Sequence, residues 1–149
     1  MRDLIHHAAA LGVKVHFAHI DDDPRLLGYY SPKHKIIVVR LGMTYAQTRW
    51  VLGHEVGHAY YAHRCTGAAS RSMAERQANA YAARVLIDPA EYARLERINP
   101  DQHWLAEEFT VHVDAIRAFE EHCLTSLRGV TYTNARMGLG QWAYRAAVS

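Results

Sequence analysis

The chain has 149 residues, half of them hydrophobic, and a formal net charge of +2 with its histidines neutral. This length allows one domain with a substantial core, and the hydrophobic content excludes a disordered chain. The small net charge argues against a protein whose main role is to coat nucleic acid or an anionic membrane. Two isolated cysteines and the lack of a long apolar run predict a soluble protein of the reducing cytoplasm.

The first third of the chain predicts one helix followed by three strands. Apolar residues recur at helical spacing over residues 2–11 and alternate with polar residues over 13–20. Two further β-favouring runs, 26–30 and 35–39, are separated by a short segment that contains proline, which predicts a hairpin. The aspartate-rich stretch 21–24 is interpreted as a solvated turn, because it lacks the spaced ligands and the glycine of an EF-hand loop.

A capping box formed by Thr44 and Gln47 predicts the start of a helix that continues to about residue 63. Gly53 and Gly57 lie inside this helix, where each glycine costs about 1 kcal/mol relative to alanine. We therefore expect another element to pack closely against the helix at these glycines.

The same helix contains the motif HExxH, with His54, Glu55 and His58. Two histidines four residues apart lie on one face of a helix, so their ring nitrogens can converge on one metal ion. Imidazole nitrogen is a preferred ligand of zinc. Glu55 lies beside such an ion, where its carboxylate can take a proton from water. The motif therefore predicts a catalytic zinc site.

A catalytic zinc site needs three protein ligands and one open position. The extended motif HExxHxxGxxH does not supply the third ligand, because Tyr61 and Arg64 replace its glycine and last histidine and His63 is one residue out of register. Glu75 in the next predicted helix is the better candidate, because it shares a stripe of small apolar residues with Asn79, and a buried carboxylate is costly unless paired or bound to metal. Asn79, one turn further on, can hold a ligand in place by hydrogen bonding.

Ser72 and Glu75 also have the form of a capping box, which predicts a helix start at Ser72 and gives Glu75 an alternative role as part of a cap. The helix is predicted to continue to Ile87 and to end at Asp88 and Pro89.

The segment HEVGHAYYAH, followed after a short loop by ERQANAYAARVLI, resembles the core of the ImmA/IrrE metallopeptidases, relatives of the gluzincins. The resemblance implies a zincin-like α+β fold, in which a small antiparallel sheet packs on an active-site helix and a glutamate helix, followed by a small helical segment. It implies one Zn²⁺ bound by His54, His58 and Glu75. Glu55 corresponds to the general base and Asn79 to the residue that supports a ligand.

The last third predicts two short helices around a turn near residues 110–113, with Asn99 and Pro100 at the start of the first. Glu120 and Glu121 on the second helix would repel phosphate, which favours a packing unit over a DNA reader. The end of the chain has little periodicity and predicts a loosely structured basic tail. The predicted organisation is a metallopeptidase core, a helical segment and a tail, at residues 1–98, 99–125 and 126–149.

Two function classes remain open. The first is a zinc endopeptidase of narrow specificity, and the resemblance implies a protein substrate such as a DNA-binding repressor of a phage or mobile element. The second is a non-enzymatic binding module, similar to an anti-repressor or antitoxin, that acts by contact alone. DNA binding through residues 100–124 is a weaker third hypothesis.

Two further features bear on the peptidase hypothesis. A donor for the developing oxyanion would help catalysis, and the candidates nearest the motif are Tyr60, Tyr61, His63 and Tyr81. If the strand at residues 35–39 forms the edge of the sheet, an extended substrate can bind by adding a strand to it.

Overall fold

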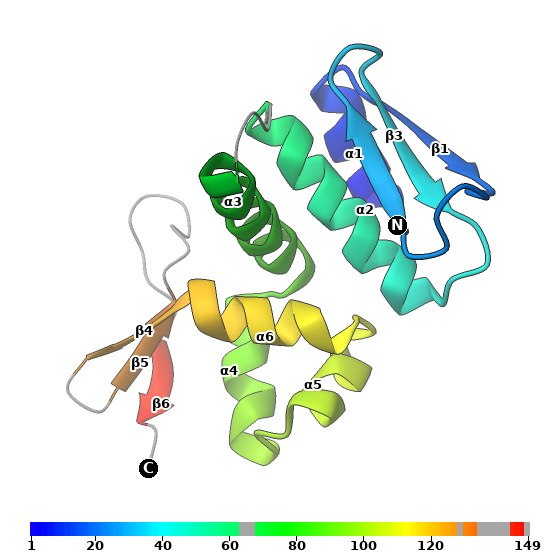
Figure 1. Ribbon diagram of the computed structural model, residues 1–149. Helices are drawn as coiled ribbons and strands as arrows, with labels where there is room; N and C mark the ends of the chain where they lie inside the picture. The colour runs from blue at the N-terminus through cyan, green and yellow to red at the C-terminus, as the bar shows by residue number, and fades with distance from the viewer. Residues whose placement is uncertain (63–67, 128–129, 134–143, 148–149) are drawn as a thin grey trace. The chain divides into compact units, whose positions relative to one another are not determined.

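The computed structural model describes residues 1–62, 68–127, 130–133 and 144–147, which form six helices and two three-stranded sheets (Figure 1). The helices are α1 (Arg2–Ala10), α2 (Tyr45–Tyr60), α3 (Ala68–Leu86), α4 (Pro89–Ile98), α5 (Gln102–Phe109) and α6 (Val113–His122). The strands are β1 (Lys14–Ala18), β2 (Gly28–Ser31), β3 (Ile36–Arg40), β4 (Leu124–Leu127), β5 (Val130–Thr133) and β6 (Tyr144–Ala147). The α+β class predicted from the sequence is confirmed.

The first sheet lies in the first of two compact units, Met1–Ala82, and has the strand order β1-β3-β2. Strands β2 and β3 form the predicted antiparallel hairpin. Strand β1 pairs with β3 in parallel, so the sheet is mixed. The resemblance had implied a sheet that is antiparallel throughout. The sequence analysis considered segment 35–39 as an edge strand. This segment belongs to β3, which is the central strand, and β2 lies at an edge of the sheet.

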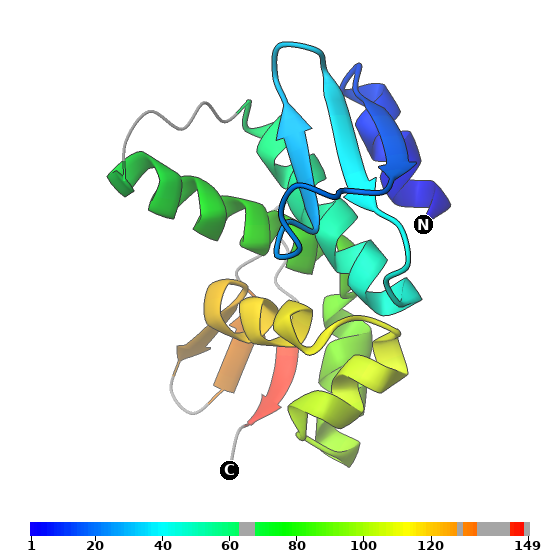
Figure 2. The ribbon, with the colours of Figure 1, turned by 45° about the vertical axis from the view of Figure 1, so that its right-hand side comes forward.

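The core of this unit forms between the sheet and its helices. Alternation along β3 places Ile37 and Val39 on the same face, and both are fully buried. Helices α1 and α2 pack against each other and against this sheet (Figure 2). Leu52 and Val56 of α2 are fully buried as well. The sheet therefore supports α2 along the part that carries the HExxH motif.

Helix α2 begins with the capping box predicted from the sequence. The hydroxyl of Thr44 accepts from the backbone N–H of Gln47 at 3.1 Å, and the Gln47 side chain accepts from the Thr44 N–H at 3.3 Å. The helix ends at Tyr60, earlier than the predicted end near residue 63. His63 itself lies outside the described residues.

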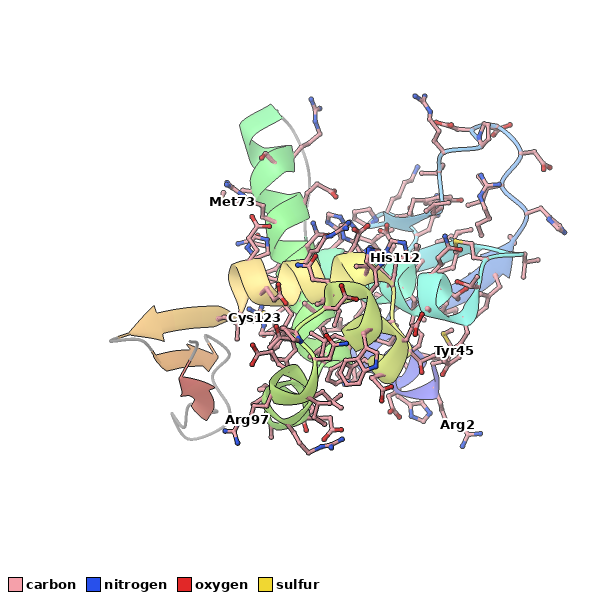
Figure 3. The ribbon with its side chains drawn as sticks, turned by 90° about the horizontal axis from the view of Figure 1, so that it is seen from below. Arg2, Tyr45, Met73, Arg97, His112 and Cys123 are labelled. Atoms are coloured by element: carbon pink, nitrogen blue, oxygen red, sulfur yellow. The ribbon has the colours of Figure 1, made fainter. Side chains whose placement is uncertain are left out.

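The predicted close packing is present at Gly57. A Cβ atom on Gly57 would lie 2.9 Å from Cα and 3.0 Å from the carbonyl oxygen of Ala78 in α3. The backbones of α2 and α3 therefore approach to a distance that only glycine permits. The predicted helix start at Ser72 is wrong, because α3 begins at Ala68 and Ser72 lies inside it, next to the exposed Met73 (Figure 3).

The second unit comprises Ala83–Ser149, so the boundary between the units falls inside α3. The sequence analysis places the end of the core at residue 98 and assigns no element to residues 89–98, which form α4 with Pro89 in its first turn. The two short helices and their turn are confirmed as α5 and α6. The cap of α5 is Asp101, whose side chain accepts from the Trp104 N–H at 2.9 Å, and not Asn99 as predicted.

The end of the chain contains more regular structure than predicted. Strands β4, β5 and β6 form an antiparallel sheet in a segment where the sequence predicts a loosely structured tail. Cys123, labelled in Figure 3, precedes β4. It is fully buried, and burial raises the pKa of its thiol to about 11. In the described part of the chain, no helix has the length and apolar character needed to cross a membrane.

Candidate metal centre

Helices α2 and α3 bring three potential metal ligands together. His54 and His58 extend from α2, and Glu75 extends from α3. Their ligand atoms lie within 4.8 Å of one another. The Nε2 atoms of His54 and His58 are 3.0 Å apart, and each lies 3.0 Å from one carboxylate oxygen of Glu75. The three residues predicted as ligands therefore converge on one point.

This arrangement fits a zinc ion. Ligand bonds of about 2.0–2.1 Å in tetrahedral geometry place neighbouring ligand atoms about 3.3 Å apart, close to the separations in this centre. Two imidazoles and one carboxylate form a donor set known from catalytic zinc sites, which leave a fourth position open. The histidine side chains are 16% and 11% exposed, whereas the Glu75 side chain is 55% exposed. The centre is therefore accessible from the side of the glutamate.

A hydrogen bond fixes the orientation of His54. Its Nδ1–H donates to the side-chain oxygen of Asn79, with a nitrogen–oxygen distance of 2.7 Å. Because Nδ1 carries the proton, the lone pair of Nε2 is directed to the centre. Glu75 and Asn79 lie four residues apart on α3, so both contact His54 from the same face of that helix.

Glu55 lies next to the three potential ligands and is almost fully buried. Burial raises the pKa of Glu55 to about 7, with a further contribution from the charge of Glu75, although His54 and the Tyr30 N–H lower it. A carboxylate that can exchange a proton near neutral pH therefore lies beside the centre.

His54 and Glu75 also change each other's affinity for protons. The hydrogen bond from His54 is the main reason that the pKa of Glu75 is lowered. Burial lowers the pKa of His54, but the bond with Glu75 and the charges of Glu55 and Glu75 raise it more, so that its net shift is upward from 6.5. In the metal-free protein, a proton on His54 is thus stabilised by the same carboxylate that would bind the metal.

Three of the candidate oxyanion donors form an aromatic cluster. The Tyr60 ring lies 5.0 Å from both the Tyr61 and the Tyr81 ring, and the Tyr81 hydroxyl lies 3.3 Å from Nδ1 of His7 on α1. These contacts join α1, α2 and α3, and a role of any of these residues in catalysis stays a prediction.

The sequence analysis missed two residues at the centre. The ring of Trp50 lies 6.3 Å from that of His54, one helical turn away, a spacing that could have identified it. The backbone of Tyr30 lowers the pKa of Glu55, and no local pattern in the sequence indicates such an effect.

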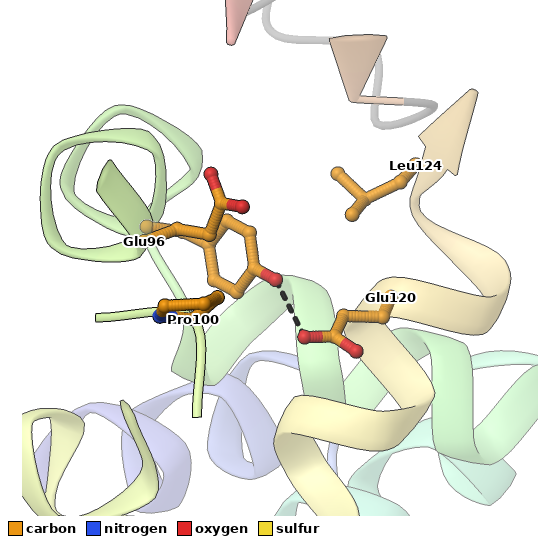
Figure 4. Close-up of a pocket in the computed structure, with 5 residues that line it drawn as sticks. Glu96, Pro100, Glu120 and Leu124 are labelled. Atoms are coloured by element: carbon orange, nitrogen blue, oxygen red, sulfur yellow. Dashed lines mark hydrogen bonds between the residues drawn. The ribbon is translucent and has the colours of Figure 1, made fainter. Parts of the chain in front are cut away.

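The second unit contains a separate cavity of about 260 Å³ (Figure 4). Its lining includes Glu96, Pro100 and Leu124, and the Tyr92 hydroxyl donates to Glu120 at 2.6 Å. The other carboxylate oxygen of Glu120 accepts from the side-chain amide of Gln102 at 2.9 Å. These bonds join α4, α5 and α6, so Glu120 has a structural role at this cavity.

Comparisons with known proteins agree with the geometry. A family model described as Peptidase_M78, IrrE N-terminal-like domain, matches residues 8–119. Among solved structures, a Mycobacterium tuberculosis transcriptional regulator is similar, with a TM-score of 0.59, 16% sequence identity, and coverage of 78% of this chain and 39% of that one. At this identity the likeness shows the fold alone, and the chain spans well under half the length of that regulator. Comparison with curated proteins gave no match.

Proposed function

The chain belongs to the Peptidase_M78 family, and from this membership we propose that it is a zinc-dependent peptidase. The observation that carries the proposal is the convergence of His54, His58 and Glu75 on one point, with Glu55 beside them. This arrangement combines three metal ligands with a separate carboxylate, as metal-assisted hydrolysis of a peptide bond requires.

A zinc ion held by His54, His58 and Glu75 would polarise the peptide carbonyl as a Lewis acid and lower the pKa of a water molecule. Glu55 accepts a proton from this water as its oxygen attacks the carbonyl carbon. When the carbon–nitrogen bond breaks, Glu55 donates the proton to the leaving amine. Asn79 holds the His54 ring in the orientation that directs Nε2 to the metal.

We further propose a narrow specificity for a partner protein, with a DNA-binding repressor as the expected substrate. The resemblance to the ImmA/IrrE metallopeptidases supports this choice, because members of that family are associated with repressors of phages and other mobile elements. Narrow recognition also agrees with the expected cytoplasmic location, where an unspecific peptidase would damage the cell.

The decisive experiment compares the wild-type chain with Glu55→Gln and Glu75→Ala. Each variant is co-expressed with a repressor encoded near its own gene, and a reporter measures repression while immunoblotting measures the length of the repressor. The zinc content of each purified protein is measured by plasma emission spectroscopy. We expect about one zinc per chain in the wild type and in Glu55→Gln, and much less in Glu75→Ala.

We expect cleavage by the wild type only, because Glu55→Gln retains the ligands but removes the base. Relief of repression by Glu55→Gln, with an intact repressor, would instead support the non-enzymatic binding module. Full zinc content in Glu75→Ala would show that the third ligand is another residue, and His63 would be tested next.

A further inference from the structure

Three aromatic rings follow one another along helix α2 at the candidate metal centre. Trp50, His54 and His58 lie at intervals of four residues, so their side chains form one stripe of the helix. The ring centroids of Trp50 and His54 are 6.3 Å apart with 51° between the ring planes, and those of His54 and His58 are 4.6 Å apart with 81°. Aromatic rings attract each other at centroid distances of about 4.5–7 Å. His54 is therefore the middle ring of a stack.

The direction of side chains in a helix makes Trp50 the support of His54. A helical side chain leans toward the N-terminus of the helix and covers the preceding turn. The residue one turn before His54 is Trp50, so the imidazole leans on the indole, just as the ring of His58 leans on that of His54. Trp50 is itself partly buried, so the surrounding protein restricts the movement of its indole.

The hydrogen bond to Asn79 leaves the His54 ring one freedom that this contact removes. The 2.7 Å bond fixes the direction of Nδ1, but a ring held at one atom can still pivot about that bond. Such a pivot would move Nε2 away from Nε2 of His58 and from the nearest carboxylate oxygen of Glu75, each at 3.0 Å. The indole lies on the N-terminal side of the ring and opposes the pivot.

We propose that Trp50 is a positioning residue, which holds the plane of the His54 imidazole so that Nε2 stays directed to the metal. The inference rests on the proposed zinc-dependent function and assigns a role in it to a residue that binds no metal. Asn79 selects the tautomer of His54, and Trp50 restricts the orientation of the ring.

The first test observes the His54 ring by NMR in the metal-free protein. Three-bond couplings report the χ1 rotamer of His54, and nuclear Overhauser effects report its contact with the indole. We expect the contact and a single rotamer in the wild type, and averaged couplings in Trp50→Ala. Trp50→Phe should retain the single rotamer, because it keeps an aromatic ring at this position. The matched control is Trp104→Ala, the same substitution at a partly buried tryptophan of α5, which should leave the couplings of His54 unchanged.

The second test measures metal binding by the same variants. In competition with a chromophoric chelator, we expect Trp50→Ala to bind zinc about 3- to 10-fold more weakly than the wild type, and Trp50→Phe to remain within about two-fold of it. The visible absorption spectrum of the cobalt-loaded protein reports the ligand geometry and should change in Trp50→Ala alone. Urea denaturation of each metal-free variant separates a loss of folded protein from a loss of metal affinity.

The outcomes separate this inference from the proposed function. A single His54 rotamer together with wild-type zinc affinity in Trp50→Ala would overturn the inference. Equal losses in Trp50→Ala and Trp50→Phe would also overturn it, because the phenyl ring would then give no support. A loss in Trp50→Ala that Trp50→Phe restores would support it. The NMR couplings require neither zinc nor cleavage, so a wild type that binds zinc and leaves the repressor intact would count against the proposed function alone.

Discussion

The hydrogen bond between His54 and Asn79 determines which ring nitrogen of His54 can bind a metal. At 2.7 Å it holds the proton on Nδ1 and directs Nε2 to the centre. We predict that Asn79→Ala weakens zinc binding by about 10- to 100-fold, because the ring is then free to rotate and to change its tautomer. Competition with a chromophoric chelator measures this affinity.

The matched control is Asn79→Asp, which keeps an oxygen at the same position. We expect Asn79→Asp to retain at least the wild-type affinity, since its carboxylate accepts the same hydrogen bond and adds a favourable charge. Wild-type affinity in Asn79→Ala would show that the contact does not orient the ligand.

At the residue scale, the sequence identifies the groups that follow from helical spacing. His54 and His58 lie four residues apart on one helix, and Glu75 shares a stripe with Asn79 on another, so their convergence could be predicted. The contribution of Tyr30 could not be predicted, because it is a backbone group and its position depends on how β2 packs against α2.

At the scale of the elements, the close contact between α2 and α3 holds the candidate ligands His54 and His58 near Glu75. A side chain at Gly57 would meet the backbone of Ala78 and the Cβ of Tyr81 at 2.9–3.1 Å, and none of these atoms is the flexible end of a side chain. We predict that Gly57→Ala lowers the free energy of unfolding by up to about 2 kcal/mol, because overpacking of about 1–3 kcal/mol exceeds the gain in helix propensity of about 1 kcal/mol.

The same substitution should weaken zinc binding, because it moves Glu75 away from His54 and His58. Urea denaturation of the metal-free protein measures the first effect, and chelator competition measures the second. A variant that is about 1 kcal/mol more stable than the wild type, as helix propensity alone predicts, would show that α3 can move away at no cost.

Some elements could not be predicted because one residue is compatible with two different local structures. Pro89 after Asp88 ends one helix, but proline is equally suited to the first turn of the next, and here it begins α4. The parallel pairing of β1 with β3 joins strands that are not consecutive, and alternation within a strand does not identify its partner. By contrast, the hairpin of β2 and β3 and the cap of α2 follow from local signals and were predicted.

At the scale of the whole molecule, the metal centre belongs to one of the two units. The three candidate ligands, the supporting Asn79 and the proposed base all come from residues within Met1–Ala82. A metal ion at this centre would cross-link α2 to α3. Because the ligands are brought together only by the fold, metal binding should stabilise the folded state of this unit against unfolding.

Protons compete with the metal for the same groups. In the metal-free protein the pKa of His54 is raised above 6.5, so its protonated form stabilises the fold at pH values below 6.5, and this contribution is lost as the pH rises through the raised pKa. Metal binding has the opposite dependence, because both histidines must be neutral. For each histidine proton that the metal must displace, the metal affinity falls by up to ten-fold for every pH unit below the pKa of that histidine. A ten-fold change in affinity corresponds to about 1.4 kcal/mol of binding free energy.

These opposite dependences predict how the effect of the metal varies with pH. The difference in Tm between the zinc-loaded and the chelator-treated protein should increase as the pH rises from about 5.5 to about 8, with most of the change near and above the ordinary histidine pKa of about 6.5. Differential scanning calorimetry of both forms across this range measures it. In the variant His54→Ala, which removes the group that carries the raised pKa, the difference should be small at every pH. A wild-type difference that is constant or decreases with pH would mean that zinc does not replace a proton at His54, and that the ion binds through groups that are already deprotonated.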